Sequence, residues 1–91
     1  MGLVEQLVDV VGVEVVADHR LRLTFADGVI GEVDFRGREW KGLLAPLADP
    51  AYFAQVRVDP EAGTISWPNG VDFAPEPLYD EARRRRLLRQ T

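Results

Sequence analysis

Apolar and polar residues alternate along the first third of the chain, from Leu7 to Phe35, and this pattern predicts three short β-strands. The clearest segment is residues 20–25, in which leucine and phenylalanine alternate with arginine and threonine. A period of two is typical of a strand that buries one face and exposes the other. We therefore expect an antiparallel meander with one apolar face over this region.

The loop lengths in this meander follow from keeping the apolar residues on one face. A three-residue loop at residues 26–28 sets Phe25 opposite Val29 and Leu21 opposite Val33, whereas a two-residue loop would place charged residues beside the core. We therefore expect the three-residue loop, with Gly28 in the left-handed conformation of a bulged turn.

The same argument applies to the connection before residue 20. An odd loop at residues 17–19 sets Val15 opposite Leu21 and Val13 opposite Leu23. It also predicts that Val11 lies on the same apolar face as Val13 and Val15.

The second half of the chain predicts a short helix, a second hairpin and a C-terminal helix. Asp49-Pro50 is typical of a helix start, so residues 50–55 should form a helix with Phe53 toward the core. Residues 56–58 and 64–67 alternate around a turn. The last helix should begin near Glu76 and run toward Gln90, with an apolar stripe of Leu78, Tyr79 and Ala82. The fold class expected is α+β: a three-stranded antiparallel meander, a short helix, a second β-hairpin and a C-terminal helix.

Composition bounds the function. The 91 residues contain no cysteine, so disulfides and thiolate metal sites are excluded. No apolar run approaches the roughly 20 residues that cross a bilayer, and the N-terminus lacks the basic start of a signal peptide, so we expect a cytoplasmic protein.

Residues 1–82 are expected to form a single domain. They hold six of the eleven basic and all fifteen acidic residues, a net charge of −9. Residues 83–91 form an arginine-rich end.

Few residues suit catalysis. His19 is the only histidine and Ser66 the only serine, and nothing in the sequence brings them together. We expect His19 to be an exposed turn residue. Glu32 and Asp34 should lie side by side on the outer sheet face, where a solvated pair is the ordinary interpretation and a small hydrolase a third hypothesis. We expect no catalytic residue, cofactor or metal site.

Three segments carry a resemblance. Residues 67–79, which read Trp-Pro-Asn-Gly-Val-Asp-Phe-Ala-Pro-Glu-Pro-Leu-Tyr, resemble the DUF2442 family together with residues 23–28 and 47–53. The resemblance covers about residues 10–80. It implies a compact α+β domain, a gene often adjacent to one for a DUF4160 protein, and a role like that of an antitoxin. It supplies no catalytic residue.

Two sets of residues are candidates for binding. Turn and helix-cap chemistry accounts for much of residues 67–79, but aromatic and polar groups there also suit a partner surface. The candidates for partner binding are Trp67, Asn69, Asp72, Glu76, Tyr79, Leu87 and Leu88. The two leucines fall outside the predicted apolar stripe, so we also expect a homodimer in the absence of the partner, through the last helix or an outer strand.

The arginine-rich end has two interpretations. Arg83, Arg86 and Arg89 could contact phosphates, making the protein a DNA- or RNA-binding autoregulator. Alternatively, Asp80 pairs with Arg84 and Glu81 with Arg85 at helical spacing, which would make the arginines structural.

Overall fold

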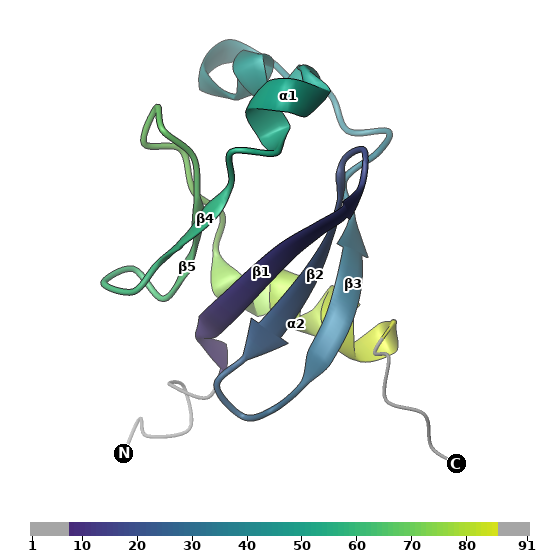
Figure 1. Ribbon diagram of the computed structural model, residues 1–91, viewed down its shortest axis with the longest axis vertical. Helices are drawn as coiled ribbons and strands as arrows, with labels where there is room; N and C mark the ends of the chain where they lie inside the picture. Colours follow the sequence, from purple (N-terminus) through teal and green to yellow (C-terminus); the bar gives the residue numbers. More distant parts are fainter. Residues whose placement is uncertain (1–7, 86–91) are drawn as a thin grey trace.

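The computed structural model describes residues 8–85 and has the predicted α+β fold. The fold has a three-stranded sheet and a separate hairpin. One helix crosses the three-stranded sheet, and the hairpin and two short helices lie beside it (Figure 1). The elements in chain order are β1 (Val10–Ala17), β2 (Arg20–Phe25), β3 (Ile30–Asp34), the 3₁₀ helix η2 (Gly42–Ala48), α1 (Pro50–Phe53), β4 (Arg57–Asp59), β5 (Thr64–Ser66) and α2 (Pro75–Arg84). The strands form two antiparallel sheets, β1-β2-β3 and β4-β5.

The register of β2 against β3 is the predicted one. Leu21 lies opposite Val33, and the Phe25 N–H donates to the Val29 carbonyl at 2.9 Å, which leaves a three-residue turn. Gly28 has a φ of +94°, a conformation that glycine adopts without steric cost. Keeping the apolar side chains on one face was therefore enough to fix this turn.

Strand β1 has the predicted pairing with β2 but two irregularities that the alternation did not predict. Val13 lies opposite Leu23 and Val15 opposite Leu21, as expected. However, the register shifts between Val10 and Gly12 and again between Val15 and Ala17, so Val11 and Val16 are bulge residues. The first hairpin therefore turns over only two residues, 18 and 19.

The expectation that Val11 shares the apolar face is wrong. The first bulge turns Val10 into the core, where it is 2% exposed, and leaves Val11 56% exposed. A bulge puts two residues opposite one, and here the second of the two valines is the one displaced toward solvent.

The core lies between one face of the three-stranded sheet, helix α2 and the region of α1 and β5. Its fully buried large side chains are Trp67, Phe25, Phe35, Phe53, Leu21, Leu23, Leu47, Ile65, Val10 and Val33. Helix α2 buries Leu78 and Ala82 against this face and crosses β3 at Gly31. A Cβ at Gly31 would lie 2.7 Å from the Ala82 carbonyl carbon, so the absence of a side chain there allows the helix to approach the strand.

Helix α1 begins as predicted. The Asp49 side chain accepts from the Ala51 N–H at 3.0 Å, and Pro50 occupies the first helical position. Phe53 is fully buried, also as predicted.

Helix α2 is shorter than the sequence predicted. It ends at Arg84, and Arg85 leaves the helical conformation with φ −123° and ψ 34°. The Arg85 carbonyl accepts from the Glu32 N–H of β3 at 3.3 Å, so the end of the helix is held at the sheet edge rather than continuing outward.

Candidate functional site

Trp67 lies in the core. Its side chain is 1% exposed, its indole N–H donates to the Phe53 carbonyl at 2.9 Å, and its ring packs against Phe53 and Phe73 with centroids 5.4 and 5.5 Å away. A buried, hydrogen-bonded indole offers no surface to a partner. Trp67 is therefore a structural residue and not the interface anchor that the sequence suggested.

Asn69 fastens the turn after β5 to the two short helices. Its backbone N–H donates to the Tyr52 hydroxyl at 2.9 Å, and its side-chain amide donates to the Leu43 carbonyl at 3.1 Å. Its side-chain oxygen accepts from the Val71 N–H at 3.2 Å, which closes the turn. All these contacts are within the domain, so turn chemistry explains why an asparagine stands here.

The other residues of the 67–79 segment are placed around α2. Asp72 is exposed and forms an isolated antiparallel bridge with Ser66. Glu76 is exposed in the first turn of α2, where a carboxylate complements the helix dipole as expected.

Tyr79 ties α2 to the turn between β2 and β3. Its hydroxyl donates to the Asp27 carboxylate, and its ring meets Phe25 edge-on with centroids 5.0 Å apart. Arg83 lies over the Tyr79 ring at 5.7 Å. Although desolvation acts to raise it, the pKa of Asp27 lies below its usual value, because the carboxylate accepts from Tyr79 and from the Val29 N–H and lies near the Arg83 charge.

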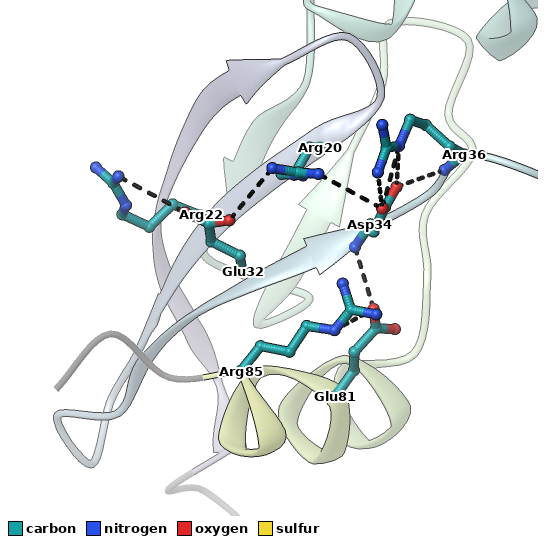
Figure 2. Close-up of polar contacts among 7 residues, drawn as sticks. All are labelled: Arg20, Arg22, Glu32, Asp34, Arg36, Glu81 and Arg85. Carbon is teal, nitrogen blue, oxygen red and sulfur yellow. Dashed lines mark hydrogen bonds and ion pairs between the residues drawn. The ribbon is translucent and has the colours of Figure 1, made fainter. Parts of the chain in front are cut away.

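Glu32 and Asp34 belong to a ladder of opposite charges on the outer face of the sheet (Figure 2). Arg20 lies 3.9 Å from Glu32 and 3.8 Å from Asp34 and so bridges the two carboxylates. Arg22 lies 3.8 Å from Glu32, and Arg36 binds Asp34 at 2.6 Å. The outer face is therefore a cross-strand ion-pair network rather than two solvated acids.

This network does not suit acid–base catalysis. The Arg36 guanidinium and backbone N–H donate to the carboxylate and hold the pKa of Asp34 well below its usual range, although partial burial acts the other way. The same bond raises the pKa of Arg36. A carboxylate that stays ionised and is already bound by arginines is a poor proton carrier at neutral pH.

The C-terminal part of α2 covers the outer edge of β3. The Asp34 N–H donates to the Glu81 carboxylate at 3.1 Å (Figure 2). The Glu32 N–H donates to the Arg85 carbonyl. Glu81 also lies 3.9 Å from Arg85, which confirms one of the two helical ion pairs that were expected. Backbone donors that would otherwise be open to another strand are thus satisfied within the domain.

His19 is not the exposed turn residue that was expected. It is half-buried with a φ of +58°, and its Nε2 lies 2.6 Å from the Leu47 carbonyl oxygen. Its ring packs 4.6 Å from Phe53 and 5.8 Å from Trp40. The left-handed turn directs the imidazole back over η2 and α1, where it holds these helices to the first hairpin.

Among the described residues, strand β1 carries two of the four exposed large hydrophobic side chains, which sequence reasoning missed, and the other two are Ile30 on β3 and Leu43 on η2. Val11 and Val15 are 56% and 40% exposed. Beside Val11, a hollow of about 330 Å³ opens between β1 and the β4–β5 hairpin, lined by Asp9, Val10, Val11, Val58, Pro60 and Gly63. The doubled valines at 10–11 and 15–16, which break the alternation, were the sequence signal for the two bulges.

Comparison with known proteins identifies the family. The family described as "Protein of unknown function (DUF2442)" matches residues 10–84. The chain belongs to the DUF2442 family. No curated protein and no solved structure matches it.

The remaining candidates of this DUF2442 chain are placed only in part. Leu87, Leu88, Arg86 and Arg89 lie outside the described residues. Within residues 8–85, no helix is long and apolar enough to cross a membrane, and no group of acidic residues and histidine could hold a metal ion.

Proposed function

We propose that this DUF2442 domain is a non-enzymatic protein-interaction module, the antitoxin-like half of a two-protein system. The observation that carries the proposal is the exposed apolar surface of β1, where Val11 lines the hollow at the β4–β5 hairpin and Val15 is exposed further along the strand. Clustered exposed apolar residues with a few polar neighbours are typical of protein contact sites.

The charge ladder supports a role other than catalysis. Its carboxylates, the only pair that suggested a hydrolase, are engaged by Arg20, Arg22 and Arg36 and stabilise the sheet. We therefore propose that the outer face is structural and that the hydrolase hypothesis is the weakest of the three.

The partner that we propose is a DUF4160-type protein encoded by the adjacent gene. We propose that the two proteins bind each other in the cytoplasm. The test is co-expression of the two chains and size-exclusion chromatography of the purified pair. We expect one complex that elutes ahead of either chain. The β1 double variant Val11→Thr with Val15→Thr should weaken the complex. Leu43→Ser is its matched control, because Leu43 is 78% exposed but lies on η2 rather than on β1. Two chains that elute separately would refute the proposal.

Self-association without the partner is a second expectation. Light scattering at micromolar concentration should report about twice the monomer mass, and exchanging Leu87 and Leu88 for glutamate should reduce it if the last helix forms the contact. A monomer at all concentrations would exclude the homodimer.

The alternative function is nucleic-acid binding through the arginine-rich end. One observation favours it: Arg83 and Arg84 are exposed at the end of α2. Three phosphate contacts by Arg83, Arg86 and Arg89 would give a log–log salt slope of about −2.7. Replacing these arginines by glutamine should then abolish binding. Substitution is a cleaner test than truncation after Ala82, because truncation would also remove the Arg85 carbonyl that accepts from the Glu32 N–H of β3. The absence of binding at low salt would eliminate this function.

A further inference from the structure

We infer that the outer edge of β1 receives an extended segment of the partner protein, one in which basic and apolar side chains alternate, as an added strand of the sheet. This inference rests on the proposed interaction function and specifies where and how the partner binds. It follows from the direction of the backbone groups of β1, from the side chains beside them and from the charge of this edge.

Backbone groups in the middle of β1 point away from the sheet. The Phe25 N–H donates to the Val29 carbonyl, so the odd-numbered residues of β2 direct their backbone N–H and carbonyl groups toward β3. The even-numbered residues of β2 therefore direct theirs toward β1. The residues of β1 opposite these even-numbered positions include Gly12 and Glu14. Val13 and Val15 consequently direct their N–H and carbonyl groups outward. Within residues 8–85, the backbone bond between β1 and another element on this side is the one from the Val10 N–H to the Gly63 carbonyl, at 2.9 Å.

The two edges of the sheet therefore differ. The outward N–H groups of Glu32 and Asp34 on β3 are bonded to Arg85 and Glu81 of the C-terminal segment, whereas those of Val13 and Val15 have no such cover in the described part of the chain. An uncovered strand edge is a template for a further strand, and side-chain pockets beside it select the sequence that binds.

Apolar side chains flank this edge at two points. Val11 and Val15 are both exposed, and the hollow lined by Val10, Val58 and Pro60 lies at the Val11 end. Side chains alternate along a strand, so an added segment would place every second residue over these valines. The bulges at Val11 and Val16 limit the regular edge to residues 12–15, so the paired segment is short and we expect modest affinity.

Charge decides which occupant fits. Residues 9–18 carry three acidic residues, Asp9, Glu14 and Asp18, and no basic one. Glu14 is paired with Arg22 at 2.9 Å, whereas no ion pair within residues 8–85 involves Asp9 or Asp18. A second copy would place the same acidic strand alongside, and like charges across a strand pair are unfavourable. A basic segment complements the edge and the net charge of −9 on residues 1–82.

The probes are three synthetic peptides of about nine residues, the length of an ordinary strand. The first alternates lysine and valine, the second has glutamate in place of each lysine, and the third is the lysine peptide with alternate backbone amides N-methylated. Fluorescence anisotropy of labelled peptides at low salt measures binding. We expect the lysine peptide to bind at least about tenfold more tightly than the glutamate peptide, since a few surface ion pairs supply that factor. The N-methylated peptide should lose binding.

Two variants locate the site on β1. Val13→Pro removes an outward N–H, which an edge strand tolerates because no ladder bond is lost. Val11→Thr with Val15→Thr keeps the preference for a strand but removes the apolar surface, and so covers the case in which the proline variant fails to fold. Both should weaken binding of the lysine peptide by about tenfold or more, whereas Leu43→Ser should not. Amide exchange of Val13 and Val15 should slow when the peptide is bound.

Equal binding of the lysine and glutamate peptides, binding that survives N-methylation, or binding that neither β1 variant weakens would overturn the inference. A dimer that Val13→Pro converts to a monomer would also overturn it, by assigning the edge to a second copy. These outcomes are distinct from failure of the proposed function. A DUF4160-type partner that co-purifies equally with wild type and both β1 variants would leave the interaction function intact and refute strand addition alone.

Discussion

Replacing Gly31 by alanine tests the packing of α2 on the sheet most directly. A Cβ at this position would lie 2.7 Å from the Ala82 carbonyl carbon and 2.9 Å from its Cα. Carbon atoms in contact need about 3.5–4.0 Å, so α2 must move by about 1 Å. The obstructing atoms belong to the backbone of a helix, and no side-chain rotation can relieve the overlap.

The cost of Gly31→Ala can be assembled from the contacts that such a shift disturbs. Overpacking a core costs about 1–3 kcal/mol. The hydrogen bonds from Glu32 to the Arg85 carbonyl and from Asp34 to the Glu81 carboxylate would also lengthen from 3.3 and 3.1 Å, each with a loss of up to about 1–2 kcal/mol. We expect a loss of about 2–5 kcal/mol, a large part of the total stability of a domain of this size.

Urea unfolding of the Gly31→Ala variant measures this loss, with Gly12→Ala as the matched control. Gly12 is also a strand glycine, but a Cβ there would lie 3.3 Å from the Thr24 Cβ, so a shift of a few tenths of an ångström is enough to accommodate it. The control should change stability by less than about 1 kcal/mol in either direction, because alanine is also favoured over glycine in a strand. Amide exchange of Glu32 and Asp34 should accelerate in Gly31→Ala. Wild-type stability with unchanged exchange would refute the described packing of α2.

Three further changes test other contacts. Asp34→Asn should flatten the loss of stability in acid, because the lowered pKa of Asp34 provides stability that is full above the unfolded value of about 4 and is lost as the pH falls through the folded one; equally steep acid unfolding curves for wild type and variant would count against this role. Trp67→Phe should cost about 2–4 kcal/mol in urea unfolding by stranding the Phe53 carbonyl and leaving a cavity, yet should not weaken partner binding; a stable variant that loses the partner would return Trp67 to the interface. Asn69→Ala should cost about 1–2 kcal/mol by the same assay through the loss of its turn and η2 contacts, and no measurable change would show that these contacts are dispensable.

The sequence predicted the parts of the fold that depend on the side-chain period. The register of the meander follows from keeping Leu21, Leu23 and Phe25 on one face, and the Asp49-Pro50 helix start follows from local cap chemistry. Both are determined within a few residues of the position concerned, so one sequence was sufficient.

The candidate site was harder to predict because it depends on tertiary contacts. Trp67 and Tyr79 looked alike as aromatic residues of one segment, but only the packing of Phe53 and Phe73 against Trp67 shows that its ring is fully covered. The end of α2 was overestimated because its apolar stripe was projected onward, whereas Arg85 bonds to an edge strand distant in the sequence. The exposure of Val11 and the limits of the regular β1 edge depend on the two bulges, which strict alternation does not contain.

The cover that α2 places over β3 has a consequence for how far assembly can proceed. Unlimited stacking of strands, as in a fibril or filament, needs a free edge on both sides of each sheet, because every unit must accept one neighbour and offer itself to another. Within the described part of this chain, the outward N–H groups of Glu32 and Asp34 on the β3 side are already bonded to Arg85 and Glu81. Strand addition at β1, as inferred above, would therefore leave no comparable free edge on the three-stranded sheet and would end in a complex of fixed stoichiometry.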